Sequence, residues 1–318
     1  MSDIILWKES LSIRAKNFFI LLRYSFLFNT KTLSGIFLLY DCEFPVHISE
    51  IFRSIQGEGL LAGTPAVFVR TTGCNLRCGF CDTAYASWNP TGQHYEVSDV
   101  LDRILRLISP LSDQGSSRLE EITHVVITGG EPMLQPEMVP LTQALAEQGL
   151  HITIETAATL HHPVSCNLMS LSPKLSNSTP QSLQERGSSS LPPFVNGDSQ
   201  ATSKINPVTT SQQPYINEHW IEKHEHLRIN PGVIRQLTTQ YTYQIKFVID
   251  QIEDVTEVDH FVNGFPEIDR SRVLLMPQAT SIEELESKSS WIQDCCHSHG
   301  FQFSSRLHIT QFGNVPGT

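Results

Sequence analysis

The chain has 318 residues, of which 40% are hydrophobic, so it can form one large domain or two smaller ones with a sizeable core. Its formal net charge is −11, which argues against a nucleic-acid partner because such partners select basic surfaces. The seven cysteines are an odd number, and they suit a reducing cytoplasm better than a disulfide-stabilised secreted protein.

Residues 1–43 differ in character from the rest of the chain. They contain short apolar runs at 18–22 and 36–40, with basic residues interspersed. No run reaches the ~18 apolar residues of a membrane-spanning helix, and no signal-peptide cleavage pattern follows. We interpret this segment as an extension outside the catalytic domain, either an amphipathic surface segment or sequence upstream of a misassigned start. No membrane partner is expected.

From residue 44 the pattern is that of an α/β domain. Apolar or alternating runs predict strands at 46–52, 66–70, 124–128, 151–156, 168–174 with its terminal turn, 243–249, 273–276 and 306–309. Helical periodicity predicts helices at 97–111 with Ser98 as N-cap, 136–148, 216–226, 254–263 and 281–299. About six parallel strands with helices between them indicate an incomplete TIM-like barrel.

Residues 175–214 interrupt this pattern. They are rich in Ser, Thr, Gln, Asn and Pro and contain few aromatic residues. This composition predicts a low-complexity insertion that is disordered or loosely held, and an inert surface loop is favoured over a regulatory site.

Three cysteines at Cys-x3-Cys-x2-Cys spacing, namely Cys74, Cys78 and Cys81, follow the predicted strand 66–70. Cysteine thiolates hold iron–sulfur clusters, and a cubane with only three of them leaves one iron open for a substrate. A zinc site with His94 as the fourth ligand and a set of incidental buried cysteines are the alternatives. The polar residues between the cysteines favour a loop that binds a cluster.

This spacing, with an aromatic residue before the third cysteine, resembles the radical S-adenosylmethionine (SAM) superfamily. There the open iron binds the amino and carboxylate groups of SAM, and an electron from the cluster cleaves SAM to methionine and a 5′-deoxyadenosyl radical. Thr-Gly-Gly-Glu-Pro at 128–132 matches the glycine motif of the superfamily, which contacts the SAM amino group.

Several motifs in a fixed order make the resemblance more specific. They are Ser-Ile-Gln-Gly-Glu-Gly at 54–59, Val-Phe-Val-Arg at 67–70, Gly-Cys-Asn-Leu-Arg-Cys at 73–78, Cys-Asp-Thr at 81–83, Thr-Gly-Gly-Glu-Pro at 128–132 and Ser-Pro-Lys at 172–174. Over residues 44–318, apart from the insertion, the chain resembles the 7-carboxy-7-deazaguanine synthase family of queuosine precursor biosynthesis.

That resemblance implies a partial (β6/α3) barrel, usually homodimeric, and a carbon–nitrogen lyase. The implied reaction converts 6-carboxy-5,6,7,8-tetrahydropterin to 7-carboxy-7-deazaguanine and releases ammonia. The implied cofactors are a [4Fe–4S] cluster, SAM and Mg²⁺, and the implied partner is a reductant such as flavodoxin or ferredoxin.

The resemblance also assigns site residues. Cys74, Cys78 and Cys81 hold the cluster, and Thr83 binds Mg²⁺. The residues implied for SAM are Phe80, Cys81, Asp82, Gly130, Ser172, Pro173, Lys174, Met276, Pro277, Gln278 and Ala279. The residues implied for the pterin are Ile55, Gln56, Gly57, Glu58, Arg70, Thr128 and Thr318, the last through its terminal carboxylate. A buried salt bridge at Arg70, a structural hydrogen bond at Glu58 and a core role for His308 are the alternative interpretations.

Two other functions stay open at this point. A radical SAM activating enzyme, which acts on a protein partner, shares the cysteine spacing and the Gly-Gly-Glu-Pro motif. It would not need Gln56, Arg70 and Thr83 around a small pocket. A non-catalytic zinc or iron–sulfur module does not explain binding motifs at the ends of separate strands, at 129–132 and 172–174.

Overall fold

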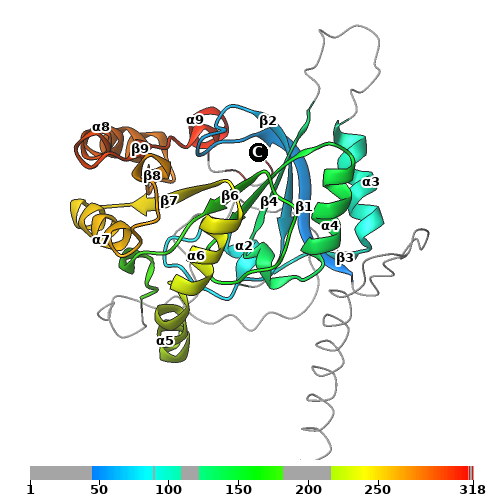
Figure 1. Cartoon of the computed structure of the whole chain (residues 1–318), viewed down its shortest axis with the longest axis horizontal. Helices are drawn as coiled ribbons and strands as arrows, with labels where there is room; N and C mark the ends of the chain where they lie inside the picture. Colours follow the sequence, from blue (N-terminus) through cyan, green and yellow to red (C-terminus); the bar gives the residue numbers. More distant parts are fainter. Residues whose placement is uncertain are drawn as a thin grey trace, which may run out of the picture. The chain divides into compact units, whose positions relative to one another are not determined.

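The structure is a computed structural model, and it describes residues 45–88, 90–108, 122–181, 216–313, 315 and 317 (Figure 1). The chain divides into two units, Met1–Asp41 and Cys42–Thr318, and every described residue belongs to the second. The predicted extension 1–43, residues 182–214 of the predicted insertion and Thr318 lie outside the described residues.

One sheet runs through the described part of the chain, in the order β3-β1-β2-β4-β5-β6-β7-β8-β9. The strands are β1 (Val46–Ile55), β2 (Pro65–Thr71), β3 (Gln93–Tyr95), β4 (His124–Gly129), β5 (His151–Thr156), β6 (Leu168–Leu171), β7 (Tyr243–Ile249), β8 (Val273–Pro277) and β9 (Gln302–Phe303). β2 and the strands from β4 to β9 are parallel, whereas β1 pairs antiparallel with both β2 and β3. The parallel α/β sheet predicted from the sequence is therefore present, with one parallel strand more than expected.

The helices follow the strands in the way the sequence indicates. They are α2 (Ala84–Ser87), α3 (Val97–Ile108), α4 (Met138–Glu147), α5 (Glu218–Leu227), α6 (Pro231–Gln240), α7 (Ile252–Asn263), α8 (Ile282–His299) and α9 (Leu307–Phe312), with 3₁₀ turns η1 (Pro132–Leu134), η2 (Ser176–Ser178) and η3 (Arg270–Arg272). Helix α6 was not predicted, although its start carries a clear signal. Asn230 caps the helix by accepting a hydrogen bond from Val233 N, and Pro231 occupies the first helical position.

Three sequence predictions differ from the structure. Helix α3 begins at Val97, so Ser98 lies in the first turn and does not cap the helix. The predicted strand 306–309 is wrong, because these residues lead into helix α9 and the last strand is β9. A run this short fits both the helical and the strand period. Residues 175–181, predicted as the start of the insertion, include η2 and belong to the fold.

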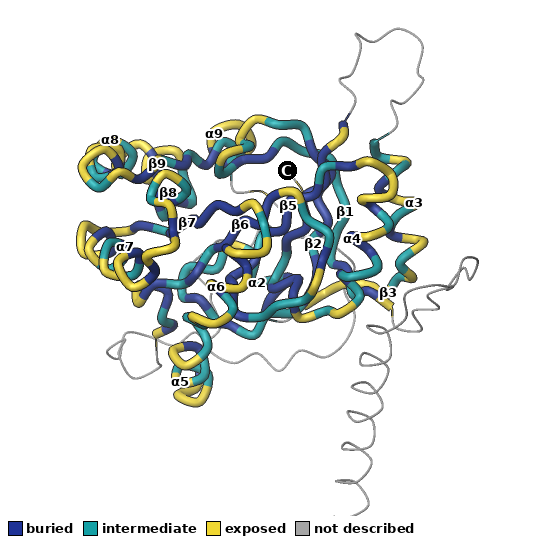
Figure 2. The backbone as a smooth tube through the Cα atoms, in the orientation of Figure 1, coloured by how far each residue is buried: buried dark blue, intermediate teal, exposed yellow. Residues whose placement is uncertain are grey.

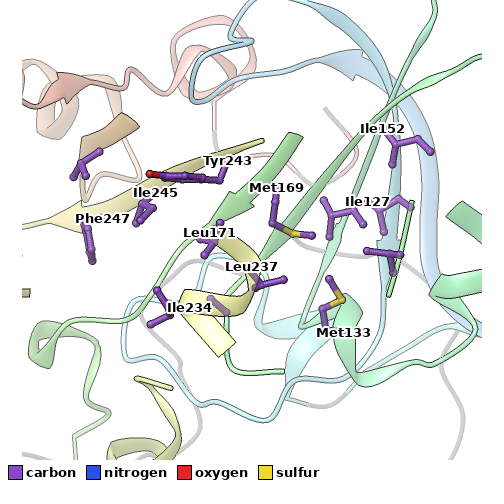
Figure 3. Close-up of a cluster of buried hydrophobic side chains, with 14 of the residues drawn as sticks. Ile127, Met133, Ile152, Met169, Leu171, Ile234, Leu237, Tyr243, Ile245 and Phe247 are labelled. Carbon is purple, nitrogen blue, oxygen red and sulfur yellow. The ribbon is translucent and has the colours of Figure 1, made fainter. Parts of the chain in front are cut away.

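Strand alternation decides which side chains form the core. Alternate positions of the central strands are fully buried against the helices: Val67 and Val69, Val125 and Ile127, Ile152 and Ile154, and Ile245 and Phe247 (Figures 2 and 3). Because successive side chains of a strand point to opposite faces, the intervening residues face the other side of the sheet. None of the described helices is both long and apolar enough to cross a membrane.

The loop between β1 and β2 connects the two ends of the sheet. Gly59 N donates to Ser304 Oγ at 2.9 Å, and Leu307 N donates to Gly57 O at 2.9 Å. Ser304 and Leu307 follow β9, at the far edge from β1 and β3. In Figure 1 this loop, in blue, reaches the red helix α9. The open side of the sheet is thus closed by a loop rather than by strand pairing.

Candidate active site

Four polar side chains, here called the polar ladder, lie on the face of the sheet opposite the core. They are Arg70, Thr128, Glu155 and Lys246. Arg70 on β2 is paired in register with Thr128 on β4. Thr128 Oγ1 donates to Glu155 Oε2 on β5 at 3.1 Å, and Lys246 Nζ on β7 donates to Glu155 Oε1 at 3.0 Å. Sheet pairing therefore brings together four side chains that are far apart in the sequence.

Lys246 joins this ladder to the β1–β2 loop. Its side chain is 4% exposed, and its Nζ lies 2.9 Å from Glu58 Oε2 in addition to its bond to Glu155. Burial opposes the charge, but the Glu155 and Glu58 carboxylates raise the pKa of Lys246 above its ordinary value. Burial alone would raise the pKa of Glu58, but Lys246 and then Arg306 hold it well below its ordinary value. Lys246 and Glu58 are consequently charged at neutral pH.

Gln56 and Arg70, both predicted to contact the substrate, are held differently. Gln56 is buried, with Nε2 donating to Glu155 Oε1 at 3.3 Å and Oε1 accepting from Glu58 N at 3.1 Å. Arg70 Nε donates to Glu50 Oε1 at 2.6 Å. The described residues provide no hydrogen-bond acceptor for Arg70 Nη1 or Nη2. The salt-bridge interpretation of Arg70 thus accounts for one nitrogen and leaves a two-nitrogen fork for a ligand.

Several site residues were missed by sequence reasoning: Glu50, Tyr85, Glu155, Lys246 and Arg306. Tyr85 OH donates to Glu50 Oε1 at 2.6 Å, so it supports the Arg70 pair. Glu155 and Lys246 carried a usable signal, because each is a charged residue at an alternate position of an otherwise apolar or neutral strand. Glu50, Tyr85 and Arg306 carried none, since their roles depend on contacts between distant segments.

The cysteine loop lies beside the Gly-Gly-Glu-Pro segment. Cys74, Cys78 and Cys81 belong to one hydrophobic cluster, in which Phe80 also packs. A Cβ atom at Gly130 would lie 1.9 Å from Gly73 O and 3.1 Å from Cys74 Cβ. Only glycine permits this close approach.

Glu131 fixes this segment to the end of β5. Its Oε1 accepts from Thr156 Oγ1 at 2.7 Å, and its Oε2 accepts from Ala157 N at 2.7 Å. The carboxylate is fully buried and bonded at both oxygens, so it holds the glycine segment against the cysteine loop.

The three thiols fit an iron–sulfur cluster. Burial raises the pKa of Cys74 to about 12 and also raises the pKa of Cys78, so the thiolates need a bound cationic group. No three His, Cys, Asp or Glu side chains within the described ranges are close enough to share one metal ion. His94, the proposed fourth zinc ligand, instead stacks on His47 with ring centroids 4.2 Å apart. Three thiols in one cluster of side chains suit a polynuclear centre: a cubane bound here would take one thiolate on each of three irons and leave the fourth iron open.

Helix α5 and the η2 turn hold the cysteine loop from outside. Arg77 N donates to His224 Nδ1 at 3.2 Å, and His224 Nε2 lies 2.9 Å from Ser178 Oγ. Gly79 N donates to Ser178 O at 2.8 Å. Burial lowers the pKa of His224 to about 4, so it is neutral at neutral pH and its Nδ1 accepts the Arg77 N–H.

The residues implied for SAM outside the cysteine loop lie in two places, and those of the first follow strand β6. Lys174 Nζ donates to Ser172 Oγ at 2.8 Å, and the Lys174 ammonium acts electrostatically on Cys74 and Cys78. Ser172, Pro173 and Lys174 therefore follow β6 beside the cysteine loop, together with Gly130.

Met276 to Ala279 form the second group at the end of β8. Ala279 O accepts from Arg306 Nη1 at 2.6 Å, and Arg306 Nη2 donates to Asp82. Gln278 is already engaged, because Lys288 Nζ donates to its Oε1 at 3.2 Å and to its carbonyl at 2.6 Å.

Three further residues singled out in the sequence, Thr83, Ile55 and His308, lie close to the cysteine loop or to the β1–β2 loop. Thr83 precedes α2, and its Oγ1 lies 3.9 Å from Cys81 Sγ. Ile55 ends β1. His308, predicted on a strand, lies in α9, where its Nδ1 would be 2.3 Å from a Cβ at Gly57. His308 thus packs against the β1–β2 loop, and a side chain at position 57 would require the His308 ring to move.

Comparison with known proteins gives consistent results. A model of the radical SAM superfamily matches residues 68–170. The chain is 33% identical over 276 residues to the 7-carboxy-7-deazaguanine synthase of Halobacterium salinarum, covering 85% of this chain and 92% of the relative. It is 36% identical over 272 residues to the synthase of Rhodopirellula baltica, covering 85% and 88%.

The crystal structure of QueE from Escherichia coli is similar in fold. The TM-score is 0.56 at 19% identity, over 87% of this chain and all of that chain. The partial TIM-like barrel predicted from the sequence is confirmed by this similarity and by the superfamily match.

Proposed function

Because the chain belongs to the 7-carboxy-7-deazaguanine synthase family of radical SAM enzymes, we propose that it converts 6-carboxy-5,6,7,8-tetrahydropterin to 7-carboxy-7-deazaguanine with release of ammonia. It is a lyase of queuosine biosynthesis. The observation that supports this substrate best is the set of polar side chains on the face of the sheet opposite the core, which the β1–β2 loop joins through Glu58 and Gln56. An enzyme that activates a protein partner has no need for such a set around a small molecule.

The cluster and SAM, when bound, supply the radical that removes a hydrogen atom from the substrate. Cys74, Cys78 and Cys81 hold the cluster. Gly130 offers its backbone to the SAM amino group, and Ser172 and Lys174 offer a hydroxyl and an ammonium group to the SAM ribose or carboxylate. The short approach between Gly130 and the cysteine loop supports this arrangement.

The pterin is bound by groups that match its edges. The amide of Gln56 and the carboxylates of Glu58 and Glu155 provide acceptors for the guanidine-like edge, and Thr128 provides a hydroxyl. Nη1 and Nη2 of Arg70, for which the described residues offer no acceptor, bind the substrate carboxylate in bidentate fashion. Positioning a small substrate with fixed donors and acceptors supplies much of the rate enhancement.

The C-terminal carboxylate of Thr318 is a further proposed substrate contact. A Cβ at Gly317 would lie 3.6 Å from Glu50 Oε2, the carboxylate that pairs with Arg70. Gly317 thus lies beside Glu50, and this proximity supports the proposed contact of Thr318 with the substrate.

Other proposals rest on the family resemblance and on composition. They are a homodimer, a flavodoxin- or ferredoxin-type reductant and a cytoplasmic location. The last is consistent with cysteines that are free throughout the described residues.

The direct test is a reconstituted reaction under anaerobic conditions. Protein with reductant, SAM, Mg²⁺ and 6-carboxy-5,6,7,8-tetrahydropterin should yield 7-carboxy-7-deazaguanine and ammonia. If SAM is cleaved but the pterin is recovered unchanged, the synthase proposal fails and the activating-enzyme alternative takes its place.

Arg70→Ala should raise the KM for the pterin about 10- to 100-fold, because a charge-assisted pair of hydrogen bonds contributes roughly 1.5–3 kcal/mol. The KM for SAM should change little. Steady-state kinetics with each substrate varied separately measures both values. Arg103→Ala is the matched control, since Arg103 stacks on Tyr95 outside the site. Equal effects on both KM values would contradict the assignment of Arg70 to the pterin.

Mg²⁺ is proposed to bind at Thr83, whose hydroxyl oxygen is a suitable hard ligand. Thr83→Ala should therefore shift the Mg²⁺ concentration for half-maximal activity upward, whereas Thr83→Ser, which keeps the hydroxyl, should not. The visible absorption of the cluster should stay unchanged in both variants. A Mg²⁺ titration that is identical for wild type and Thr83→Ala removes Thr83 from the metal site.

A further inference from the structure

One guanidinium group connects three segments that the sequence assigns to two different ligands. Arg306 Nε lies 3.2 Å from Glu58 Oε1 in the β1–β2 loop. Its Nη2 donates to Asp82 next to the third cysteine, and its Nη1 donates to Ala279 O after β8 at 2.6 Å. Glu58 is implied for the pterin, and Asp82 and Ala279 are implied for SAM.

Arg306 is well suited to hold these segments together. It is 7% exposed, and although burial opposes its charge, Asp82 and Glu58 raise its pKa further. Each of its three guanidinium nitrogens donates a hydrogen bond to a different acceptor. This arrangement requires the planar, forked guanidinium group of arginine. Lysine carries the same charge but presents a single nitrogen.

The backbone next to Arg306 strengthens the connection. Leu307 N donates to Gly57 O at 2.9 Å, so the residue after Arg306 is bonded to the residue before Glu58. The β1–β2 loop is therefore fixed to α9 through both backbone and side chain. Asp82, Ala279 and this loop therefore share one planar guanidinium group as their hydrogen-bond donor.

We propose that Arg306 is a positioning residue that couples SAM binding to pterin binding. Ordering of Asp82 and Ala279 around SAM fixes the guanidinium, and the guanidinium fixes Glu58 for the pterin. By thermodynamic linkage, the pterin then strengthens SAM binding by the same factor. This inference rests on the proposed substrate and adds the residue that makes the two sites interdependent.

The coupling is measured with the intact, cluster-loaded protein in its oxidised state, in which SAM is not consumed. Isothermal titration gives the Kd of SAM with and without saturating 6-carboxy-5,6,7,8-tetrahydropterin. The wild type should bind SAM about fivefold or more tightly when the pterin is present, within the usual range of coupling. In Arg306→Lys and Arg306→Gln the ratio should fall close to one. The Kd for SAM alone should rise in both variants, because Arg306 also holds Asp82 and Ala279, so the coupling is taken as the ratio of the two Kd values within each variant.

A second readout follows from turnover. A loosened connection should raise the amount of SAM that is cleaved per 7-carboxy-7-deazaguanine formed. Arg272→Gln is the matched control, because Arg272 bonds and stacks on Tyr243 outside these three segments. Since Arg306→Lys keeps the charge, it serves if Arg306→Gln fails to fold.

Two results overturn the proposal: full coupling in Arg306→Lys, or no coupling in a wild type that converts the pterin. A wild type that does not convert the pterin at all overturns the proposed function instead. The two failures are therefore distinguishable.

Discussion

Replacing Cys78 with alanine should remove the iron–sulfur cluster and abolish SAM cleavage, with a loss of at least about three orders of magnitude in rate, because the cofactor carries the chemistry. Cys78 is buried between Leu76 and Ala157, in the cluster that also contains Cys74 and Cys81. Two remaining thiolates cannot hold a cubane that normally takes three or four. Iron content and visible absorption of anaerobically purified protein measure the cluster without relying on activity.

Cys166→Ala is the control for this experiment. Cys166 Sγ lies 3.7 Å from Ile152 O at the start of β5 and outside the cysteine loop. Its replacement should leave the iron content and SAM cleavage unchanged. Iron content and cleavage that survive in Cys78→Ala, or that disappear in Cys166→Ala, would refute the assignment of the three ligands.

Replacing Lys246 with methionine should lower both stability and activity strongly. The substitution keeps much of the side-chain volume but leaves the half-buried Glu58 and Glu155 without the buried cation that they share. Removing one partner of a buried ion pair costs about 3–5 kcal/mol. We expect kcat/KM for the pterin to fall at least about 100-fold, since both carboxylates lose the group that orients them.

Denaturant unfolding of the cluster-loaded protein measures the stability loss, and steady-state kinetics measures the activity loss. Lys223→Met is the control, because Lys223 stacks on Trp220 and has no role in the ladder. The double variant Lys246→Met, Glu155→Gln should recover part of the stability but none of the activity, since it removes one uncompensated charge and one substrate acceptor. A Lys246→Met protein as stable and active as the wild type would show that the ion pairs of Lys246 with Glu58 and Glu155 do not support the site.

The sequence predicts those parts of the site that depend on local spacing. The cysteine loop and the Gly-Gly-Glu-Pro segment could be identified because their ligands lie within a few residues of one another. Lys246 and Arg306 could not, because their function arises from which strands and loops become neighbours. A charged residue in an apolar strand indicates an unusual environment, but it does not reveal its partner.

Prediction of the secondary structure has the same limit, because local sequence determines some elements and tertiary contacts determine others. The longest of the described helices, α8 (Ile282–His299), was predicted almost to the residue. The short segment 306–309 was predicted as a strand because Leu307 and Ile309 alternate. In the structure, tertiary contacts of Arg306 override that weak local preference, and the chain turns into α9 instead.

The hydrogen bond between Ser178 and His224 has an evolutionary consequence. These residues lie on either side of residues 182–215, and their side chains are 2.9 Å apart. A segment whose two flanks are already joined can lengthen or shorten at little cost, since each doubling of a flexible loop adds only about 0.6 kcal/mol of closure entropy. Changes in the number of residues between these flanks should therefore be tolerated better than changes of Ser178 or His224 themselves. The flanks themselves are constrained, because both bond the loop that carries the cysteines.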